Sequence, residues 1–162
     1  DSGVFSKNEL DRGTQLLLAS LPSRAGSLLD MGCGWGPIGL FYKAVNSDCS
    51  VSMCDINRRA LSLAKKSAVY NNFDCNIFES DGFSSVYGMF DIIAINPPIR
   101  AGKSVIYKMF ADSKLHLSEG GSLFIVIRKS HGAESAFSYL KTVFPFVEII
   151  EKKSGYWIIK CS

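Results

Sequence analysis

A short apolar segment that leads directly into a glycine-rich loop is the feature that most restricts the fold of this chain. Residues 27–31 have the composition of a buried strand. The loop after this strand carries a glycine at every second position, at Gly32, Gly34 and Gly36. Pro37 then suits the first turn of a helix over 37–45, where a missing N–H needs no partner. A strand, a glycine loop and a helix in this order bring backbone amides and a helix N-terminus against a bound ligand.

Strands and helices alternate along the rest of the chain. Further strands are expected near 49–55, 75–79, 89–96 and 121–128, and helices near 57–71, 103–117 and 132–143. This order predicts a parallel sheet with right-handed crossovers. The last two segments, 146–152 and 156–161, predict an antiparallel hairpin. We therefore expect an α/β, Rossmann-like fold with a mostly parallel seven-stranded sheet and helices on both faces.

The expected strand over 89–96 ends in Asn96, Pro97 and Pro98. Neither proline can donate a ladder hydrogen bond, and each restricts the residue before it, so the strand stops abruptly. The Asn96 carboxamide oxygen and the Pro97 carbonyl are then held side by side on a stiff backbone. Two such acceptors suit the N–H groups of a planar NH2 group. A strand that simply ends in a Pro-Pro turn is the plainer interpretation of the same residues.

Acidic side chains follow three of the expected strands, at Asp30, Asp55 and Asp81. In an open α/β sheet, ligands bind at the carboxyl ends of the strands. Asp30, beside the glycine loop, suits a ligand with an α-ammonium group. Asp55 is placed to accept the two hydroxyls of a ribose, or to be the N-cap of the following helix. Asp81 is placed to accept an adenine amino group with Phe83 nearby, or to form a turn with Gly82.

The acidic residue at this loop separates two cofactor classes. Gly34, Gly36 and Gly39 match the dinucleotide fingerprint, which predicts a nicotinamide or flavin enzyme. That fingerprint begins where its strand ends, whereas this loop opens at Gly32, and Asp30 would repel a pyrophosphate. The pattern from Asp30 to Gly36 instead resembles the S-adenosylmethionine loop of Rossmann-like methyltransferases. S-adenosylmethionine is therefore the predicted cofactor.

Further motifs extend the resemblance over nearly the whole chain. They are Gly3-Val4-Phe5-Ser6, Asp11-x-Gly13-Thr14, Asn96-Pro97-Pro98-Ile99-Arg100-Ala101-Gly102-Lys103 and Gly155-Tyr156-Trp157-Ile158. With the glycine loop, these motifs are similar to those of small-domain class I methyltransferases related to the RsmC-type ribosomal RNA guanine-N2 methyltransferases. The resemblance implies an S-adenosylmethionine-dependent enzyme that methylates an exocyclic amino nitrogen, N2 of a guanine in small-subunit ribosomal RNA.

The resemblance also assigns roles to residues. Asn96, Pro97 and Pro98 would be catalytic. The cofactor would be bound by Thr14, Asp30, Gly32, Gly34, Gly36, Asp55 and Asp81, and the substrate by Phe5, Ile99, Arg100 and Lys103. The implied partner is RNA, as ribosomal RNA or a ribosomal subunit. Many Asn-Pro-Pro enzymes have an aromatic residue in place of Ile99 that stacks on the base, and Phe5 is the substitute expected here.

Other functions share parts of this pattern. Release-factor glutamine-N5 methyltransferases carry Asn-Pro-Pro but usually continue with Tyr, which Ile99 does not match. DNA adenine methylation is disfavoured because the chain has no target-recognition domain. A non-catalytic S-adenosylmethionine-binding or ribosome-assembly module is the alternative outside the enzymes, and the intact Asp30, Asp55 and Asn96 weigh against it.

Composition fits one domain over residues 1–162, without an apolar run near the roughly 18 residues of a membrane span. The five cysteines are odd in number and lack the spacing of a metal site, which predicts no metal and a reducing, cytoplasmic location. Neither His116 nor His131 is expected to be catalytic. The net charge of +3 does not by itself indicate a nucleic-acid binder. Asp1 replaces an initiator Met, so a trimmed chain or the catalytic half of a longer protein is expected.

Overall fold

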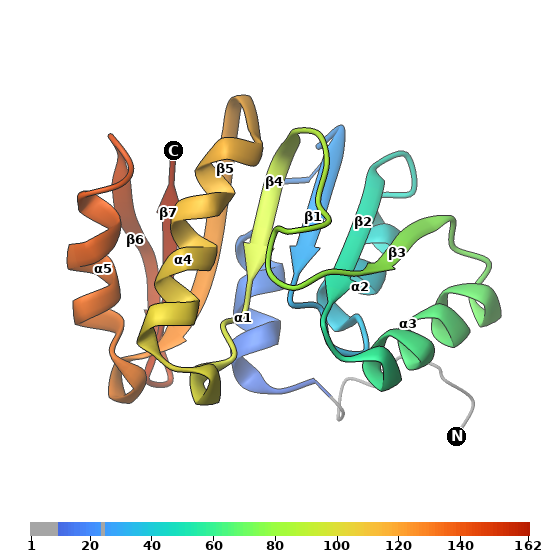
Figure 1. The fold of residues 1–162 in the computed structure, drawn as a ribbon, viewed down its shortest axis with the longest axis horizontal. Helices are drawn as coiled ribbons and strands as arrows, with labels where there is room; N and C mark the ends of the chain where they lie inside the picture. Colours follow the sequence, from blue (N-terminus) through green and yellow to red (C-terminus); the bar gives the residue numbers. More distant parts are fainter. Residues whose placement is uncertain (1–9, 24) are drawn as a thin grey trace.

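A seven-stranded sheet forms the centre of the structure, a computed structural model that describes residues 10–23 and 25–162. Within these residues the strand order is β3-β2-β1-β4-β5-β7-β6 (Figure 1). The strands are β1 (Ser27–Met31), β2 (Ser50–Asp55), β3 (Cys75–Glu79), β4 (Phe90–Ile95), β5 (Leu117–Arg128), β6 (Val147–Lys153) and β7 (Tyr156–Cys161). β7 runs antiparallel to both of its neighbours, and the remaining pairings are parallel.

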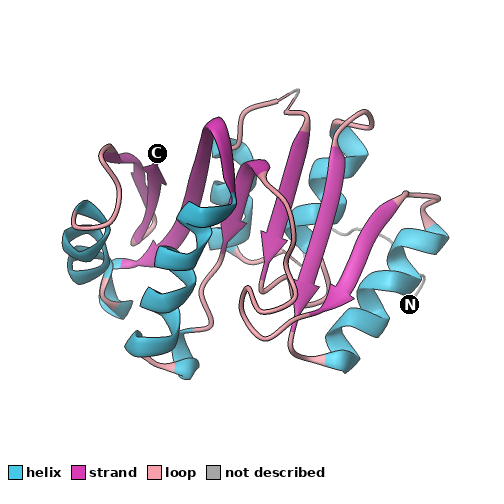
Figure 2. Cartoon of the chain, turned by 45° about the horizontal axis from the view of Figure 1, so that its top comes forward, coloured by secondary structure: helices cyan, strands magenta, loops and turns pink. Residues whose placement is uncertain are grey.

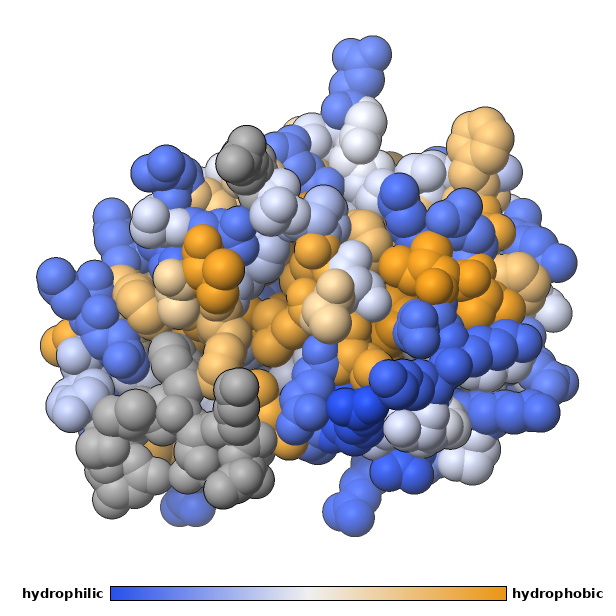
Figure 3. Space-filling model, turned by 180° about the vertical axis from the view of Figure 1, so that it is seen from behind, coloured by the Kyte–Doolittle hydropathy of each residue, from blue (hydrophilic) through white to orange (hydrophobic). Residues whose placement is uncertain are grey.

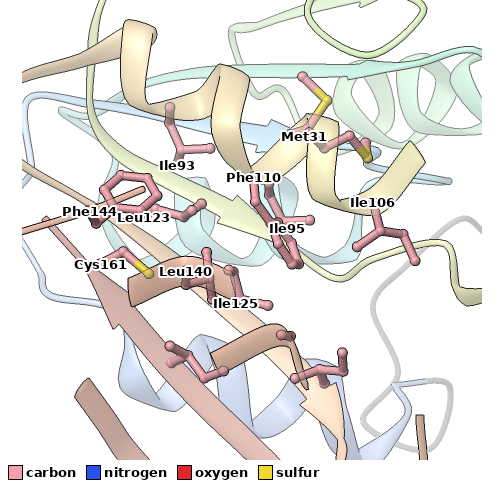
Figure 4. Close-up of a cluster of buried hydrophobic side chains, with 14 of the residues drawn as sticks. Met31, Ile93, Ile95, Ile106, Phe110, Leu123, Ile125, Leu140, Phe144 and Cys161 are labelled. Atoms are coloured by element: carbon pink, nitrogen blue, oxygen red, sulfur yellow. The ribbon is translucent and has the colours of Figure 1, made fainter. Parts of the chain in front are cut away.

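Helices cover both faces of the sheet (Figures 1 and 2). The α-helices are α1 (Arg12–Ser20), α2 (Pro37–Val45), α3 (Arg58–Tyr70), α4 (Lys103–Ser113) and α5 (Ala133–Lys141). The described residues also form the short 3-10 turns η2 (Ile99–Ala101), η3 (Lys114–His116) and η4 (Lys129–His131). Leu17 of α1, Leu40 of α2 and Leu61 of α3 share one buried cluster. Phe110 of α4 and Leu140 of α5 belong to the cluster on the opposite face (Figure 4).

The central strand β4 is buried on both of its faces. Ile93 and Ile95 pack in the cluster that contains α4 and α5 (Figure 4), whereas Ile92 and Ala94 pack in the other cluster. An uninterrupted apolar run is what a strand between two helical layers requires. Each buried isoleucine contributes about 1.5–3 kcal/mol, so the two cores together fix β4 and the Asn96 that follows it.

Strand order reverses between β1 and β4, which lie side by side in the sheet. The chain leaves β1 into α2 on one face, and it leaves β4 toward α4 on the other. Such a switch point opens a crevice at the carboxyl ends of the strands, where α/β proteins bind ligands. These ends lie along the lower edge of the molecule in Figure 1, which brings the glycine loop next to the Asn-Pro-Pro segment.

The predicted mostly parallel seven-stranded sheet with its C-terminal hairpin is confirmed. One boundary was wrong, because β5 begins at Leu117 instead of residue 121. Leu117 pairs with Phe90, and the register shifts before the next pair. Gly121 approaches the Phe90 carbonyl so closely that an added Cβ would lie 2.9 Å from its oxygen. Glycines at this irregularity interrupt the apolar pattern from which the strand was read.

The helical segments agree with the prediction except at two places. The helix expected over 103–117 is α-helical only to Ser113 and continues as the 3-10 turn η3. The helix α1 was not predicted at all.

Among the described residues, no helix combines the length and the apolar character needed to cross a membrane. Seen from behind, hydrophilic side chains interrupt the apolar areas of the surface (Figure 3).

Candidate active site

The glycine loop between β1 and α2 turns back over the end of β2. Three loop glycines have positive φ angles, Gly32 (70°), Gly34 (57°) and Gly36 (94°). These angles are strained for residues with a Cβ. The Cys33 N–H donates to the Cys54 carbonyl at 2.9 Å, and α2 begins at Pro37 immediately after the loop. The predicted strand, glycine loop and helix are therefore present.

Asp30 lies beneath this loop with 1% of its surface exposed. Its Oδ2 accepts the Gly39 N–H at 2.9 Å, whereas its Oδ1 is buried without a hydrogen-bond partner among the described residues. Burial raises the pKa of Asp30 to about 7, because loss of water penalises the charged form. An unpaired buried oxygen is costly, and an N–H donor or a cation on a ligand would satisfy it.

Asp55 ends β2 at the mouth of the same crevice. Its Oδ2 accepts the Gly34 N–H and its Oδ1 accepts the Asn57 N–H, both at 2.8 Å. The N-cap of α3 is Asn57, whose side chain accepts the Ala60 N–H at 3.1 Å. The N-cap role considered for Asp55 therefore belongs to Asn57, two residues further along the chain. Each carboxylate oxygen of Asp55 keeps a second lone pair that a ligand hydroxyl can use.

A large pocket of about 770 Å³ opens beside the glycine loop. It is lined by Met31, Gly32, Asp55, Ile56, Ser80, Asp81, Gly82, Phe83, Ser84, Pro98, Ala101, Val105, Lys108, Met109, Asp112, Leu115 and His116. The Phe83 ring stacks on the His116 ring at 5.1 Å between centroids, which supplies a flat apolar wall. Asp112 is paired with Lys108 at 2.6 Å, and the carboxylates of Asp55 and Asp81 leave the pocket acidic. Its size and lining suit a nucleoside that carries positive charge and disfavour a pyrophosphate.

A smaller pocket of about 230 Å³ lies on the other side of the Asn-Pro-Pro segment. It is lined by Asp11, Asn96, Pro97, Ile99, Val126, Ile127, Arg128, His131 and Tyr156. Asn96 and Pro97 contribute to this pocket, and the adjacent Pro98 contributes to the larger one. The segment after β4 therefore forms the partition between the two pockets.

A chain of side-chain hydrogen bonds fixes the orientation of Asn96. The Thr14 hydroxyl donates to Asp11 Oδ2 at 3.3 Å and accepts from Asn96 Nδ2 at 3.4 Å. A hydroxyl has one proton, and a carboxylate can only accept, so the carboxamide must turn its NH2 toward Thr14. Asn96 Oδ1 then points away, without a hydrogen-bond partner among the described residues.

Arg128 and Tyr156 also line the smaller pocket. Arg128 Nε donates to the Tyr156 hydroxyl at 3.1 Å, and the guanidinium carbon lies 4.7 Å from the ring centroid. A hydrogen bond and a cation–π contact together hold the guanidinium in place. The pocket thus has acceptors at Asn96 and Pro97 and a cationic donor, Arg128, held by Tyr156.

The structure brings seven of the fourteen predicted site residues to the two pockets. Gly32, Asp55, Asp81 and Pro98 line the larger pocket, and Asn96, Pro97 and Ile99 line the smaller one. Asp30, Gly34 and Gly36 lie in or under the loop without lining either pocket. Phe5 lies outside the described residues.

Three predicted residues have surroundings that the sequence did not indicate. Thr14, assigned to the cofactor, is buried against Asn96 and does not line the larger pocket. Arg100 and Lys103 are exposed beside the site and line neither pocket. The resemblance had assigned residues 5–14, which include Asp11, to the cofactor's methionine end or to the target-base pocket, and Arg128 had been expected at the catalytic edge. Sequence reasoning gave no pocket role to His131 or Tyr156, which line the smaller pocket with them.

Metal ligands do not gather at this edge. In the part of the chain that the structure describes, no group of three or more His, Cys, Asp or Glu side chains is arranged to hold a metal ion. The cysteines are free thiols, and burial raises the pKa of Cys54 to about 12. A buried thiol of this kind is an unreactive packing group at neutral pH.

Comparison with known proteins agrees with the geometry of this edge. The family model of the methyltransferase small domain matches residues 1–160. The chain belongs to the methyltransferase small domain family. A Bacillus subtilis relative, "Uncharacterized protein YbxB", is 46% identical over 165 aligned residues, which cover 99% of this chain and 82% of the relative.

Longer relatives share the same domain. "Ribosomal RNA small subunit methyltransferase C" of Aeromonas hydrophila is 43% identical and covers 95% of this chain but 45% of the relative. The chain thus spans less than half the length of this relative. The solved structure of the T. thermophilus 16S rRNA N2 methyltransferase RsmC, in complex with AdoMet and guanosine, matches with a TM-score of 0.84 and 21% identity, over 98% of this chain and 45% of that one. This likeness confirms the predicted Rossmann-like class I methyltransferase fold.

Proposed function

We propose that this methyltransferase small domain transfers a methyl group from S-adenosylmethionine to N2 of a guanine in small-subunit ribosomal RNA. The observation that carries the proposal is the position of Asn96 and Pro97 on the partition between the two pockets. Relatives named ribosomal RNA small subunit methyltransferase C support the substrate class. The structural neighbour in complex with AdoMet and guanosine supports a site with room for both ligands.

The larger pocket fits S-adenosylmethionine in several respects. Asp30 does not line this pocket, but its partnerless Oδ1 lies beneath the adjoining glycine loop, on the side proposed for the α-ammonium group. Asp55 lines the pocket with lone pairs suited to the ribose hydroxyls, and Asp81 offers an acceptor for the adenine amino group beside the apolar Phe83. Bound there, the cofactor would supply a methyl group activated by its attachment to a sulfonium.

The smaller pocket would hold the target base. Asn96 Oδ1, which the bond to Thr14 leaves without a partner, and the Pro97 carbonyl would accept the two N–H groups of the exocyclic amine. These bonds draw electron density toward the amine nitrogen and aim its lone pair across the partition. Alignment of this kind supplies most of the acceleration when the leaving group is already activated. The base must be unpaired or flipped out to enter the pocket.

A substrate panel tests the proposal. The protein is incubated with S-adenosylmethionine labelled on its methyl group and with naked ribosomal RNA, small ribosomal subunits, transfer RNA or a release factor. Labelled RNA is then digested to nucleosides and separated by mass. We expect N2-methylguanosine from ribosomal RNA or from small subunits. Label on a release-factor glutamine, on another nucleoside, or on none of the substrates would contradict the proposal.

A further inference from the structure

Asp11 stands on the wall of the smaller pocket next to the groups that would hold the target amine. Its Oδ1 accepts the Thr14 N–H at 2.8 Å, which makes Asp11 the N-cap of α1. Its Oδ2 accepts the Thr14 hydroxyl at 3.3 Å. Each oxygen retains a second lone pair, and among the described residues no Lys or Arg forms an ion pair with this carboxylate. Asp11 is therefore a fixed acceptor with unused capacity.

Asp11 and Asn96 are linked through one residue at the smaller pocket. A single hydroxyl, that of Thr14, bridges the Asp11 carboxylate and the Asn96 carboxamide. Both side chains line the same pocket of about 230 Å³, which has room for little more than one base. One base in this pocket can therefore contact both side chains.

The ring atom adjacent to the amine differs among the bases. In guanine the amine N2 is flanked by N1, which carries a hydrogen and donates, and by N3, which has a lone pair, so the bond to Asp11 forms when N1 faces the carboxylate. In adenine and cytosine the amine is flanked by a ring nitrogen with a lone pair. A carboxylate accepts from an N–H group and repels a lone pair, so the same contact attracts guanine and rejects the other two. Arg128, which lines the same pocket and is held by Tyr156, adds a donor suited to the guanine O6.

We propose that Asp11 is a specificity-determining residue that selects guanine by accepting a hydrogen bond from its N1–H, while Asn96 and Pro97 hold N2. The inference rests on the proposed function and deepens it. The acceptors Asn96 and Asp11 match the donors N2 and N1 of guanine. The donor Arg128 matches its acceptor O6. No proton leaves N1, so the role of Asp11 is recognition and not chemistry.

Binding of two free nucleosides tests this role separately from methyl transfer. Guanosine and 2-aminopurine riboside both carry an amine at position 2, but 2-aminopurine has a lone pair at N1 and no O6. Their affinities are measured by calorimetry with S-adenosylhomocysteine present, which fills the cofactor site without turnover. The variant is Asp11→Asn, because Asn is also a good N-cap and α1 is retained. Asp74→Asn, on an exposed residue before β3, is the matched control.

We expect the wild type and Asp74→Asn to prefer guanosine, and Asp11→Asn to reduce the ratio of the two affinities about tenfold or more, as for the loss of a hydrogen bond to a charged group. Equal affinities in the wild type, an unchanged ratio in Asp11→Asn, or no binding of guanosine would overturn the inference. If the wild type methylates guanine in RNA but Asp11→Asn leaves the ratio of nucleoside affinities unchanged, the role of Asp11 is rejected and the proposed function stands. Failure of the wild type to methylate any RNA would reject the proposed function.

Discussion

The two ends of the Asn96 carboxamide face different partners, and this asymmetry decides what the residue can do. Nδ2 donates to the Thr14 hydroxyl, which is itself directed by Asp11. Oδ1 is thereby presented to the smaller pocket. Without Thr14, the carboxamide would be free to flip and to turn a donor toward the substrate amine, which cannot accept it. The proposed catalytic group thus depends on a residue that the sequence had assigned to the cofactor.

At this residue scale, Asn96→Ala should reduce kcat by roughly 10²–10³-fold, by analogy with removal of an oxyanion-hole donor. Cofactor affinity should stay near that of the wild type, because Asn96 does not line the larger pocket. Thr14→Val, which keeps the side-chain shape, should cause a smaller loss of kcat. Methyl transfer and the melting temperature are measured on one preparation, with Asn76→Ala on exposed β3 as the control. A destabilised Asn96→Ala protein with normal turnover would mean that Asn96 only ends the strand.

The buried carboxyl of Asp30 makes the stability of the folded protein depend on pH. Burial raises the pKa of its carboxyl to about 7, whereas in the unfolded chain the group titrates near 4. Between these values the folded state holds a proton that the unfolded state has lost. Stability from this group therefore falls as pH rises from about 4 to about 7, and the loss is complete above that range.

Asp30→Asn should remove this dependence. Relative to the variant, the wild type should lose stability between pH 5 and pH 8, by up to about 1.4 kcal/mol per pH unit, and each kcal/mol corresponds to about 2–4 °C in Tm. Thermal unfolding of both proteins across this range measures the difference. S-adenosylmethionine should bind the variant more weakly, since the uncharged carboxamide no longer matches an ammonium group. Parallel pH profiles for the two proteins would show that Asp30 is not the titrating group.

At the scale of elements, sequence periodicity was sufficient for the sheet and insufficient for α1. Buried strands such as β4 have uninterrupted apolar runs, and the two prolines after Asn96 mark the end of β4 without ambiguity. The first turn of α1 contains Gly13 and Thr14, which are weak helix formers. Its signals were the N-cap Asp11 and the buried Leu16 and Leu17. The site residues at strand ends were predictable from the strands themselves, whereas the segment with Asp11 was placed near the site only by the resemblance, because the packing of α1 is what brings it to the pocket.

At Gly13, the helix α1 packs closely against the Tyr156 ring. A Cβ added there would lie 2.8 Å from Tyr156 Cε1, so Gly13→Ala should destabilise the protein although alanine favours a helix by about 1 kcal/mol. Truncation of the ring should relieve the clash. In a Tyr156→Ala background, Gly13→Ala is expected to be neutral or stabilising. Free energies of unfolding in urea for the four proteins give the coupling between the two sites. Additive effects would indicate that α1 does not rest on Tyr156.

At the scale of the whole molecule, the arrangement of charge is more informative than its total. The net charge is only +3, yet exposed basic residues follow two adjacent strands, Arg100 and Lys103 after β4 and Arg128 and Lys129 at the end of β5. All four belong to the edge that carries the smaller pocket. Lys129 also lies 3.7 Å from Glu134, an exposed pair that holds it only weakly. A nucleic-acid backbone that delivers a base to the pocket would pass these side chains.

The salt dependence of RNA binding measures how many of these charges contact phosphate. For the double variant Arg100→Ala/Lys103→Ala, affinity for ribosomal RNA should fall and the slope of log K against log [salt] should become shallower by about 0.7–0.9 for each lost contact. Cofactor affinity should remain unchanged, because neither residue lines the larger pocket. Lys65→Ala/Lys66→Ala removes two exposed charges from α3, at the other side of the sheet, and serves as the matched control. Both double variants lower the net charge by the same amount. The control should therefore keep the wild-type slope if the slope reports local phosphate contacts and not net charge. Equal slopes in the two double variants would place the RNA elsewhere on the molecule.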